Sequence, residues 1–151
     1  MRIMFKEVTW DTLKEVCMLS VKCDQVSFIE SNAYSIAESK FNDEWNTVGI
    51  YIDNILVGFA MYGYISSEKR VWLDRFMIDG RFQGKGYGRK TIKELINKIF
   101  NEFKCDEIYL SIFDDNLNAL KLYKSLGFKA NGELDYGGEN IMVLTMKDYL
   151  K

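Results

Sequence analysis

The sequence contains no histidine and no proline among its 151 residues, and it has three cysteines. Without histidine, general acid–base catalysis by imidazole is excluded, and so are the Ser–His and Cys–His nucleophile pairs. A typical zinc site would also lack ligands, and the spacing of Cys17, Cys23 and Cys105 matches no zinc pattern. We therefore predict no metal site, so any catalysis has to use carboxylates, tyrosine, backbone dipoles or a bound cofactor.

Long apolar runs and long basic runs are missing as well. No apolar stretch approaches the ~20 residues that a membrane-spanning helix needs, and Met1–Lys6 shows no secretory signal. The net charge is −2 with no basic run, which disfavours a nucleic-acid partner. The chain is 48% apolar and 15% aromatic, which excludes disorder. We expect a single domain over residues 1–151, in the cytoplasm and with no membrane partner.

The most informative motif is a glycine-rich run that follows an apolar, strand-like segment, Val71–Ile78, and opens an amphipathic helix. It reads Arg81-Phe82-Gln83-Gly84-Lys85-Gly86-Tyr87-Gly88-Arg89. Bare N–H groups at the positive end of a helix form a cradle for phosphate oxygens. Glycine tolerates positive φ and lets the backbone approach a ligand closely. The motif therefore predicts a phosphate-bearing cofactor, although a solvated surface turn stays open for the motif taken alone.

Two common phosphate loops do not fit this spacing. The nucleoside-triphosphate loop needs Gly-Lys-Ser/Thr at its end, whereas Lys85 lies between two glycines and neither Ser nor Thr follows Gly86. The dinucleotide fingerprint needs G-x-G-x-x-G, whereas the glycines at 84, 86 and 88 give G-x-G-x-G. The spacing that remains is Arg81-x-x-Gly84-x-Gly86.

The pattern of apolar residues predicts an α/β fold. Hairpins come first, and a strand–loop–helix–strand–helix unit follows, which implies a mixed sheet covered by helices on both faces. The clearest helix lies between Ile92 and Phe103, where apolar residues recur on one face. The expected strands are Ile3–Val8, Thr47–Ile52, Ile55–Ile65, Val71–Ile78, Glu107–Ile112, Phe128–Leu134 and Ile141–Lys147.

A second motif follows about 30 residues after the glycine loop. It reads Asn116-x-x-Ala119-x-x-Leu122-Tyr123-x-x-x-Gly127-Phe128. The two motifs, in this order, resemble those of the GNAT superfamily of N-acetyltransferases. The resemblance implies the GNAT fold, with a mostly antiparallel mixed sheet, and acetyl-CoA as co-substrate.

Four further segments are similar to the bacterial spermine/spermidine N-acetyltransferases: Phe28–Ser31, Gly58–Tyr62, Trp72–Ile78 and Leu110–Phe113. This resemblance implies transfer of an acetyl group from acetyl-CoA to a primary amine of a polyamine, by direct attack in a ternary complex. It also makes a homodimer an expectation. Other acceptors stay open, namely a protein N-terminus, a lysine or an aminoglycoside, and so does a coenzyme A-binding regulatory module without turnover.

The resemblance also assigns the coenzyme-binding residues. The strand before the loop would pair its backbone with pantetheine, and the loop amides would face the pyrophosphate, with added positive charge from a loop side chain. Asn116 either contacts the coenzyme or caps its helix. The predicted coenzyme contacts are Phe76, Met77, Ile78, Arg81, Gln83, Gly84, Lys85, Gly86, Tyr87, Gly88, Arg89, Asn116 and Tyr123.

Tyr123 and Asp74 are the predicted catalytic residues. Tyrosine is protonated at neutral pH, with a pKa of ~10, so Tyr123 suits a general acid that donates to the coenzyme sulfur. Alternation along a strand would put Asp74 on the same face as Phe76, where it could take the proton of the incoming ammonium. The alternatives are a core tyrosine with a satisfied hydroxyl and an ion pair between Asp74 and Arg75.

A polycationic substrate also needs acidic walls. Glu30 and Asp74 are the first candidates to bind it, with Glu133 and Asp135 near the last hairpin as weaker ones. Each of these is open to the alternative of an ordinary solvated carboxylate.

Overall fold

The computed structural model describes all of residues 1–151 as seven strands and five α-helices with two short 3₁₀ turns. The strands are β1 (Ile3–Glu7), β2 (Asn46–Ile52), β3 (Ile55–Ile65), β4 (Arg70–Ile78), β5 (Glu107–Ile112), β6 (Lys129–Leu134) and β7 (Asn140–Thr145). The helices are α1 (Trp10–Met18), α2 (Asn32–Ser39), α3 (Tyr87–Phe103), α4 (Leu117–Leu126) and α5 (Met146–Tyr149). The 3₁₀ turns are η1 (Cys23–Gln25) and η2 (Gly80–Phe82).

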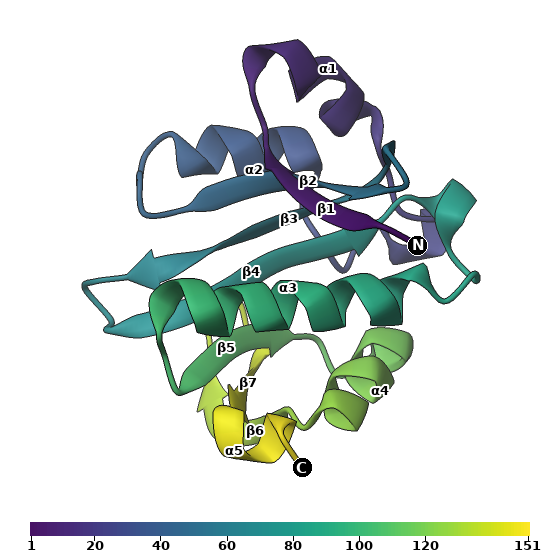
Figure 1. The fold of residues 1–151 in the computed structure, drawn as a ribbon. Helices are drawn as coiled ribbons and strands as arrows, with labels where there is room; N and C mark the ends of the chain where they lie inside the picture. Colours follow the sequence, from purple (N-terminus) through teal and green to yellow (C-terminus); the bar gives the residue numbers. More distant parts are fainter.

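All seven strands form one sheet in the order β1-β2-β3-β4-β5-β7-β6. Every neighbouring pair is antiparallel except β4 and β5, which are parallel. In Figure 1, β1 to β4 form the upper half of the molecule and β5 to β7 form the lower half, with α3 passing in front. This arrangement confirms the predicted α/β fold with a mostly antiparallel mixed sheet.

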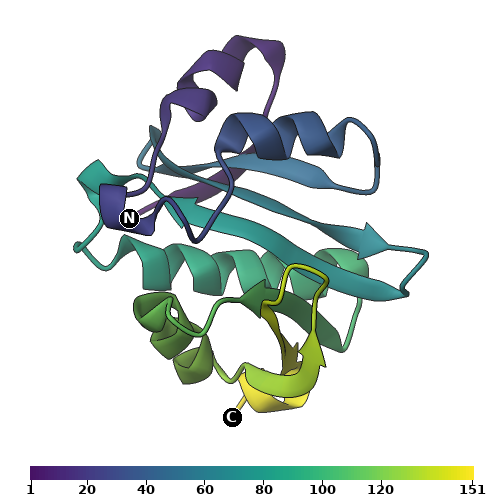
Figure 2. The same ribbon diagram turned by 180° about the vertical axis from the view of Figure 1, so that it is seen from behind.

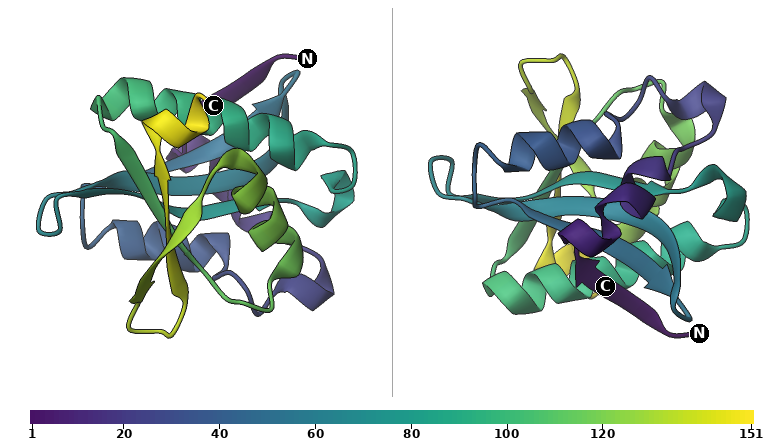
Figure 3. Two further views of the ribbon diagram at one scale, coloured as in Figure 1. Left: turned by 90° about the horizontal axis from the view of Figure 1, so that it is seen from below. Right: turned by 90° about the horizontal axis from the view of Figure 1, so that it is seen from above.

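Helices cover both faces of the sheet, as the sequence predicted. Views from below and above show α2 on one side of β2 to β4 and α3 on the other (Figure 3). The larger core cluster lies under α3, which buries Ile92, Leu95, Ile96 and Ile99 completely. A smaller cluster with Val16 and Met77 lies under α1 and α2. The amphipathic pattern of α3 therefore reflects its burial against the centre of the sheet.

The turns follow the local sequence signals closely. Asp53 and Asn54 both have positive φ, 49° and 70°, as a two-residue hairpin turn between β2 and β3 requires. Gly127 ends α4 in the left-handed region with φ of 108°. Thr9 holds the N-cap position of α1, and its N–H donates to Oγ1 of Thr12 at 3.1 Å, as in a capping box. The last strand stops at Thr145, where α5 begins.

Strand β4 is irregular at the point where the sheet opens. Met61 of β3 pairs with Arg75 and the next residue, Tyr62, pairs with Leu73, so Asp74 is an extra, unpaired residue. Such a β-bulge bends a strand and changes the direction of its side chains. Beyond it, β4 and β5 separate, since their pairing is recorded only at Trp72 and Tyr109. From behind, β5 to β7 and α4 form a lower group next to β4 (Figure 2). No helix is long and apolar enough to cross a bilayer.

Candidate active site

A cavity of about 810 Å³ lies along β4, between the two groups of strands. It runs from Gly84 and Gly88 at one end to Glu68 and Arg70 at the other. Its size falls in the range typical of small-molecule sites. The loop end is the end of the cavity near the glycine loop. The acidic end lies beyond the bulge, and its walls are the segment from η1 to α2 and the β6–β7 hairpin.

At the loop end, β4 offers unpaired backbone groups to the cavity. The N–H of Asp79 donates to the carbonyl of Val57 at 2.8 Å, so the main-chain groups of Asp79 point to β3. In an antiparallel ladder this direction alternates, so Met77 also points to β3, whereas Phe76 and Ile78 point toward β5. Of the three predicted strand contacts, Phe76 and Ile78 therefore turn main-chain groups toward the cavity, although the Ile78 carbonyl already accepts from the Gln83 side chain, and Met77 does not.

The glycine loop has the geometry of an anion cradle. Gly84 and Gly86 have φ of 78° and 81°, in the left-handed region that favours glycine. A Cβ added at Gly84, Gly86 or Gly88 would meet no atom within 4 Å, so the space above the loop is open. Helix α3 begins at Tyr87, which leaves the N–H groups of its first turn without intrahelical partners. These residues fit a pyrophosphate group, and the positive helix end adds attraction for it.

The cationic side chains near the loop have other contacts in this structure. The Nε atom of Arg81 donates to Oδ1 of Asp79 at 2.8 Å, although the Arg81 side chain is largely exposed. Nη1 of Arg89 donates to Oγ of Ser125 at 2.7 Å and so links α3 to α4. Lys85 has no salt bridge, and its ammonium lies 5.9 Å from the centre of the Phe82 ring. Their predicted role toward a phosphate stays a prediction.

Gln83 ties the loop to the segment that precedes α2. Its amide nitrogen donates to Oε1 of Gln25 at 2.9 Å and to the carbonyl of Ile78 at 2.8 Å, and its oxygen accepts from Nε2 of Gln25 at 3.1 Å. Nearby, the N–H of Ser20 donates to the carboxylate of Asp79 at 3.0 Å. The side chain of Gln83 is thus a structural link, which leaves its backbone N–H for a ligand. The link was not visible in the sequence, because its partners are 58 residues apart.

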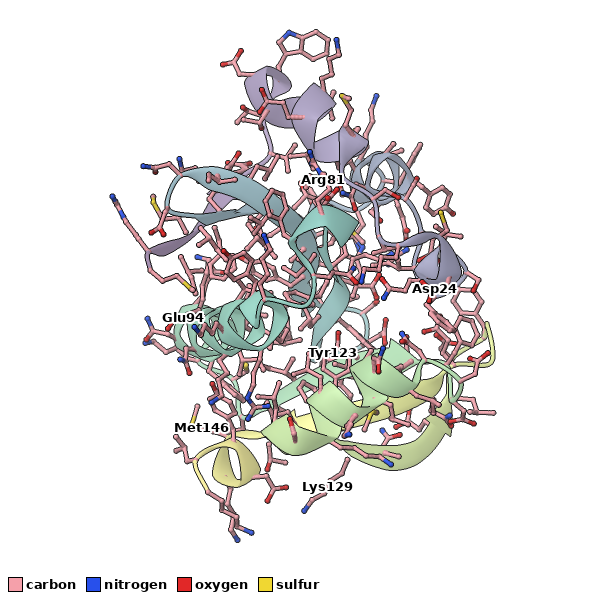
Figure 4. All side chains as sticks on the ribbon, turned by 90° about the vertical axis from the view of Figure 1, so that its right-hand side faces the viewer. Asp24, Arg81, Glu94, Tyr123, Lys129 and Met146 are labelled. Atoms are coloured by element: carbon pink, nitrogen blue, oxygen red, sulfur yellow. The ribbon has the colours of Figure 1, made fainter.

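Tyr123 lies at the centre of the site. It comes from α4, lines the cavity and packs edge-on against Phe128, with ring centres 5.6 Å apart. Figure 4 shows Tyr123 on the inner side of α4, while Lys129 points outward. Burial raises the pKa of Tyr123 to about 12, so its hydroxyl keeps its proton at neutral pH and can donate it. Asn116 occupies the N-cap position of α4 and lines the cavity, but its side chain makes no capping hydrogen bond.

At the acidic end, the buried Arg75 gathers three carboxylates. Its guanidinium forms salt bridges with Glu30 and Glu38, both at 2.9 Å, and with Asp74. Glu30 precedes α2 and Glu38 lies in it, so Asp74 and Arg75 meet on the α2 side of the sheet. Phe76 instead packs against the core on the α3 side.

The expectation that Asp74 shares a face with Phe76 is therefore wrong, because the bulge interrupts the alternation of side chains. The ion pair with Arg75, which was the alternative reading of Asp74, is present. Asp74 and Glu30 both line the cavity, and their predicted roles toward the substrate stay predictions.

Glu133 also has a cationic partner. Its two carboxylate oxygens accept from Nη1 and Nη2 of Arg70 at 3.0 and 2.8 Å, a bidentate pair. This hydrogen bonding to Arg70 lowers the pKa of Glu133. Asp135 accepts hydrogen bonds from the N–H groups of Gly137 and Glu139 within its own turn. Both acids line the cavity, but their contacts here stabilise the hairpin.

Glu139 is a cavity residue that sequence reasoning missed. It lies in the turn just before β7, has no salt bridge and is half-buried. Burial raises the pKa of Glu139, and the nearby Asp135 and Glu30 raise it further. A raised carboxyl pKa in a cavity is a common property of functional acids. The only sequence signal was its place after a Gly-Gly turn beside the last strand, which does not distinguish it from a surface residue.

Comparisons with known proteins find N-acetyltransferases among the similar sequences and structures. Residues 13–128 match the family model described as the acetyltransferase (GNAT) family. The chain is 46% identical over 149 residues to the spermine/spermidine N(1)-acetyltransferase of Bacillus subtilis, which covers 95% of this chain and 98% of that protein.

Among solved structures, the chain is similar to spermidine N-acetyltransferase from Vibrio cholerae in complex with CoA and spermine. That match has a TM-score of 0.76 and 18% identity, and covers 99% of this chain and 98% of the other. An aminoglycoside acetyltransferase, AAC(6')-Ib with coenzyme A, gives a TM-score of 0.80 at 16% identity, with the same coverage of both chains. These two likenesses show a shared fold and do not distinguish acceptors.

Proposed function

The chain belongs to the acetyltransferase (GNAT) family, and we propose that it transfers an acetyl group from acetyl-CoA to a primary amine of a polyamine such as spermidine or spermine. The observation that carries the choice of acceptor is the 46% identity, over nearly the whole chain, to a spermine/spermidine N(1)-acetyltransferase. The acidic end of the cavity supports it, since seven carboxylates and two arginines line the cavity. An extended polycation complements that surplus of negative charge.

In this proposal, the loop end binds the acetyl donor. The amides of residues 83–88 and the first turn of α3 hold the pyrophosphate, and the main chain of Phe76 and Ile78 binds the pantetheine arm. A backbone N–H of that strand polarises the thioester carbonyl. Arg81, Lys85 and Arg89 lie in or next to the glycine loop, so their positive charges can attract the pyrophosphate.

The amine attacks the thioester directly in a ternary complex. Tyr123 is the general acid for the departing thiolate, which is supported by its position on the inner side of α4 and its protonated state. Glu30, Asp74 and Glu133 contribute to the negative potential that attracts the polyamine, even where an arginine neutralises part of their charge.

An acceptor panel tests the proposal. Purified protein with acetyl-CoA should release free thiol with spermidine or spermine, and the kcat/KM for these amines should exceed that for an aminoglycoside or a lysine peptide. If polyamines give no rate while kanamycin or a peptide does, the acceptor assignment is wrong and the family assignment stands. Binding of acetyl-CoA without turnover on any acceptor would instead favour a coenzyme A-binding regulatory module.

Two further expectations, the oligomeric state and the location in the cell, stay predictions. A homodimer is expected, and sedimentation equilibrium of the purified chain would test it. A cytoplasmic location is consistent with the absence of a helix able to span a bilayer, and cell fractionation would test it.

A further inference from the structure

The carboxylates of the cavity differ in whether they are free to accept a proton. Glu30, Glu38 and Asp74 all pair with Arg75, and Glu133 pairs with Arg70. Glu68 accepts from the indole of Trp72 at 3.2 Å. A carboxylate that is already held by a guanidinium has oxygen lone pairs engaged in that contact, which leaves fewer of them to face a substrate.

Along the strand direction, Glu139 lies level with the segment of β4 that is predicted to bind the reacting groups. Trp72 of β4 is level with Tyr109 of β5, and Ile112 of β5 pairs with Asn140 of β7. Three residues further along both parallel strands, Arg75 of β4 is level with Ile112 of β5 and so with Asn140 of β7. Glu139, the neighbour of Asn140, therefore lies across the cavity from the segment Asp74–Phe76. The β6–β7 hairpin projects on the side of the sheet where α2 lies (Figure 3).

The electrostatic surroundings agree with this placement. Asp135 from the same hairpin and Glu30 from the segment before α2 raise the pKa of Glu139, whereas the Ser111 hydroxyl from β5 and Arg75 from β4 lower it. Burial is the largest influence, and it raises the pKa. Of the cavity acids, Glu68, Asp135 and Glu139 have no arginine partner. Glu68 accepts from the Trp72 indole and Asp135 accepts from main-chain N–H groups of its own turn, which leaves Glu139 with neither kind of donor.

We propose that Glu139 is the general base that removes the proton from the polyamine ammonium. This inference rests on the proposed function of the site. A carboxylate whose pKa is raised binds a proton more strongly and is therefore a better base near neutral pH. Asp74 instead pairs with Arg75 and helps to fix the position of that side chain in the cavity wall.

The proton balance of the step is as follows. Glu139 takes one proton from the ammonium, directly or through a water, and the freed lone pair forms the C–N bond to the thioester carbon. The carbonyl π pair moves to oxygen and returns as the C–S bond breaks. The thiolate takes the Tyr123 proton, and the second proton of the nitrogen returns to Tyr123 through water. Glu139 releases its proton to solvent, so one proton is released in each turnover.

The test is the pH dependence of kcat/KM for spermidine in the wild type and in Glu139→Gln. The wild type should reach a plateau once Glu139 is ionised, because the enzyme then deprotonates the acceptor. Without the base, the rate should depend on the free amine, whose pKa is near that of lysine, ~10.4, so it should rise about tenfold per pH unit from pH 7 to 9. At pH 7 the loss should be about 100-fold or more, in the usual range for a general base.

Three variants make the result decisive. Glu139→Asp should keep the plateau at a lower height, Asp74→Asn should keep it with an altered KM, and Glu7→Gln on the opposite edge strand should match the wild type. Calorimetric binding of acetyl-CoA to Glu139→Gln should be unchanged, which shows that the variant is folded.

A plateau in Glu139→Gln that disappears in Asp74→Asn would overturn the inference in favour of Asp74. A plateau that survives in both variants would overturn it in favour of another proton acceptor, and a wild-type rate that itself rises tenfold per pH unit would overturn it in favour of an unassisted free amine. Because these outcomes all require a wild type that acetylates spermidine, they are separate from failure of the proposed function.

Discussion

The two ends of the cavity are built by different means. The loop end uses backbone groups, namely the glycines of residues 84–88, the first turn of α3 and the open edge of β4. The acidic end uses side chains from distant segments, in which Arg75 meets Glu30 and Glu38 and Arg70 meets Glu133. A backbone site depends on local conformation, whereas a side-chain network depends on which segments the fold brings together.

The difference teaches where specificity can change. The shared fold of a spermidine acetyltransferase and an aminoglycoside acetyltransferase, with TM-scores of 0.76 and 0.80 to this chain, is compatible with one donor and different acceptors. A backbone cradle cannot be altered without changing the loop itself. A wall of ion pairs can be rebuilt by a few substitutions, so the acidic end is where acceptors should diverge.

The largest expected effect comes from removing the hydroxyl of Tyr123, which we propose is the general acid. Tyr123→Phe keeps the ring against Phe128 but removes the hydroxyl. We expect kcat to fall about 100-fold or more, with a KM change of a few fold at most, because the lost interaction acts in the transition state. Steady-state kinetics with spermidine will measure this. An unchanged kcat would leave Tyr123 with only a packing role.

The second prediction compares two glycines with the same conformation at the two ends. Gly86 has φ of 81° and Gly138, in the β6–β7 hairpin, has φ of 86°, and neither position crowds an added Cβ. Alanine at either site should cost about 1–2 kcal/mol of unfolding free energy, because a non-glycine residue is strained there. Only Gly86→Ala should also raise the KM for acetyl-CoA, by about tenfold.

Gly138→Ala is the control for backbone strain in that experiment. Chemical denaturation gives the stability loss of each variant, and initial rates give the KM for acetyl-CoA. If both variants raise that KM equally, strain alone explains the effect, and the glycine loop loses its special role.

The sequence predicts the backbone-built loop end better than the acidic end, which is built from distant side chains. The glycine loop, the capping glycine at 127 and the Asp53–Asn54 turn each follow from a local sequence signal, namely a residue type that tolerates positive φ. The bulge at Asp74 could not be predicted, because it exists only in the pairing of β4 with β3. It turned the side chain of Asp74 toward Arg75 and so changed what that carboxylate contacts.

The residues that sequence reasoning missed are long-range in the same sense. Gln25 meets Gln83 across 58 positions. Glu139 reaches the cavity because β7 inserts between β5 and β6. Neither belongs to a motif, and one carboxylate or amide in a loop carries no signal of its partner. Predicting them required the strand order, which the apolar pattern alone did not determine.

The third prediction tests the link between the two ends. Gln25→Leu removes both amide contacts to Gln83 but leaves the bond from Gln83 to the Ile78 carbonyl. At about 0.5–1.5 kcal/mol for a hydrogen bond, we expect the KM values for acetyl-CoA and for spermidine to rise together by about 3–10-fold. Ser20→Ala is the matched control, since the contacts of Ser20 to Asp79 and Gly80 use its backbone.

A rise in only one of the two KM values would contradict the link, because Gln83 belongs to the loop end and Gln25 to the wall of the acidic end. Calorimetry gives an independent measure. In the wild type, coenzyme A should tighten binding of spermidine, and in Gln25→Leu that gain should shrink.

The smallest expected effect is on the pH dependence of stability, which differs between Glu133 at the acidic end and Tyr123. At the acidic end, the Arg70 contact lowers the pKa of Glu133 below its ordinary 4.5, so the stability from this contact is present above pH 4.5 and is lost as the pH falls further. Tyr123 behaves in the opposite direction. Its pKa rises from 10.0 to about 12, so its contribution is intact below pH 10 and is lost as the pH rises through 12.

Tyr123→Phe removes this alkaline loss, because phenylalanine does not ionise. At pH 10.5 the wild type should therefore lose about 1 kcal/mol more of unfolding free energy than the variant, relative to pH 8. Urea unfolding of both proteins at the two pH values will measure the difference. Equal losses would mean that water reaches the Tyr123 hydroxyl freely and that burial does not raise its pKa.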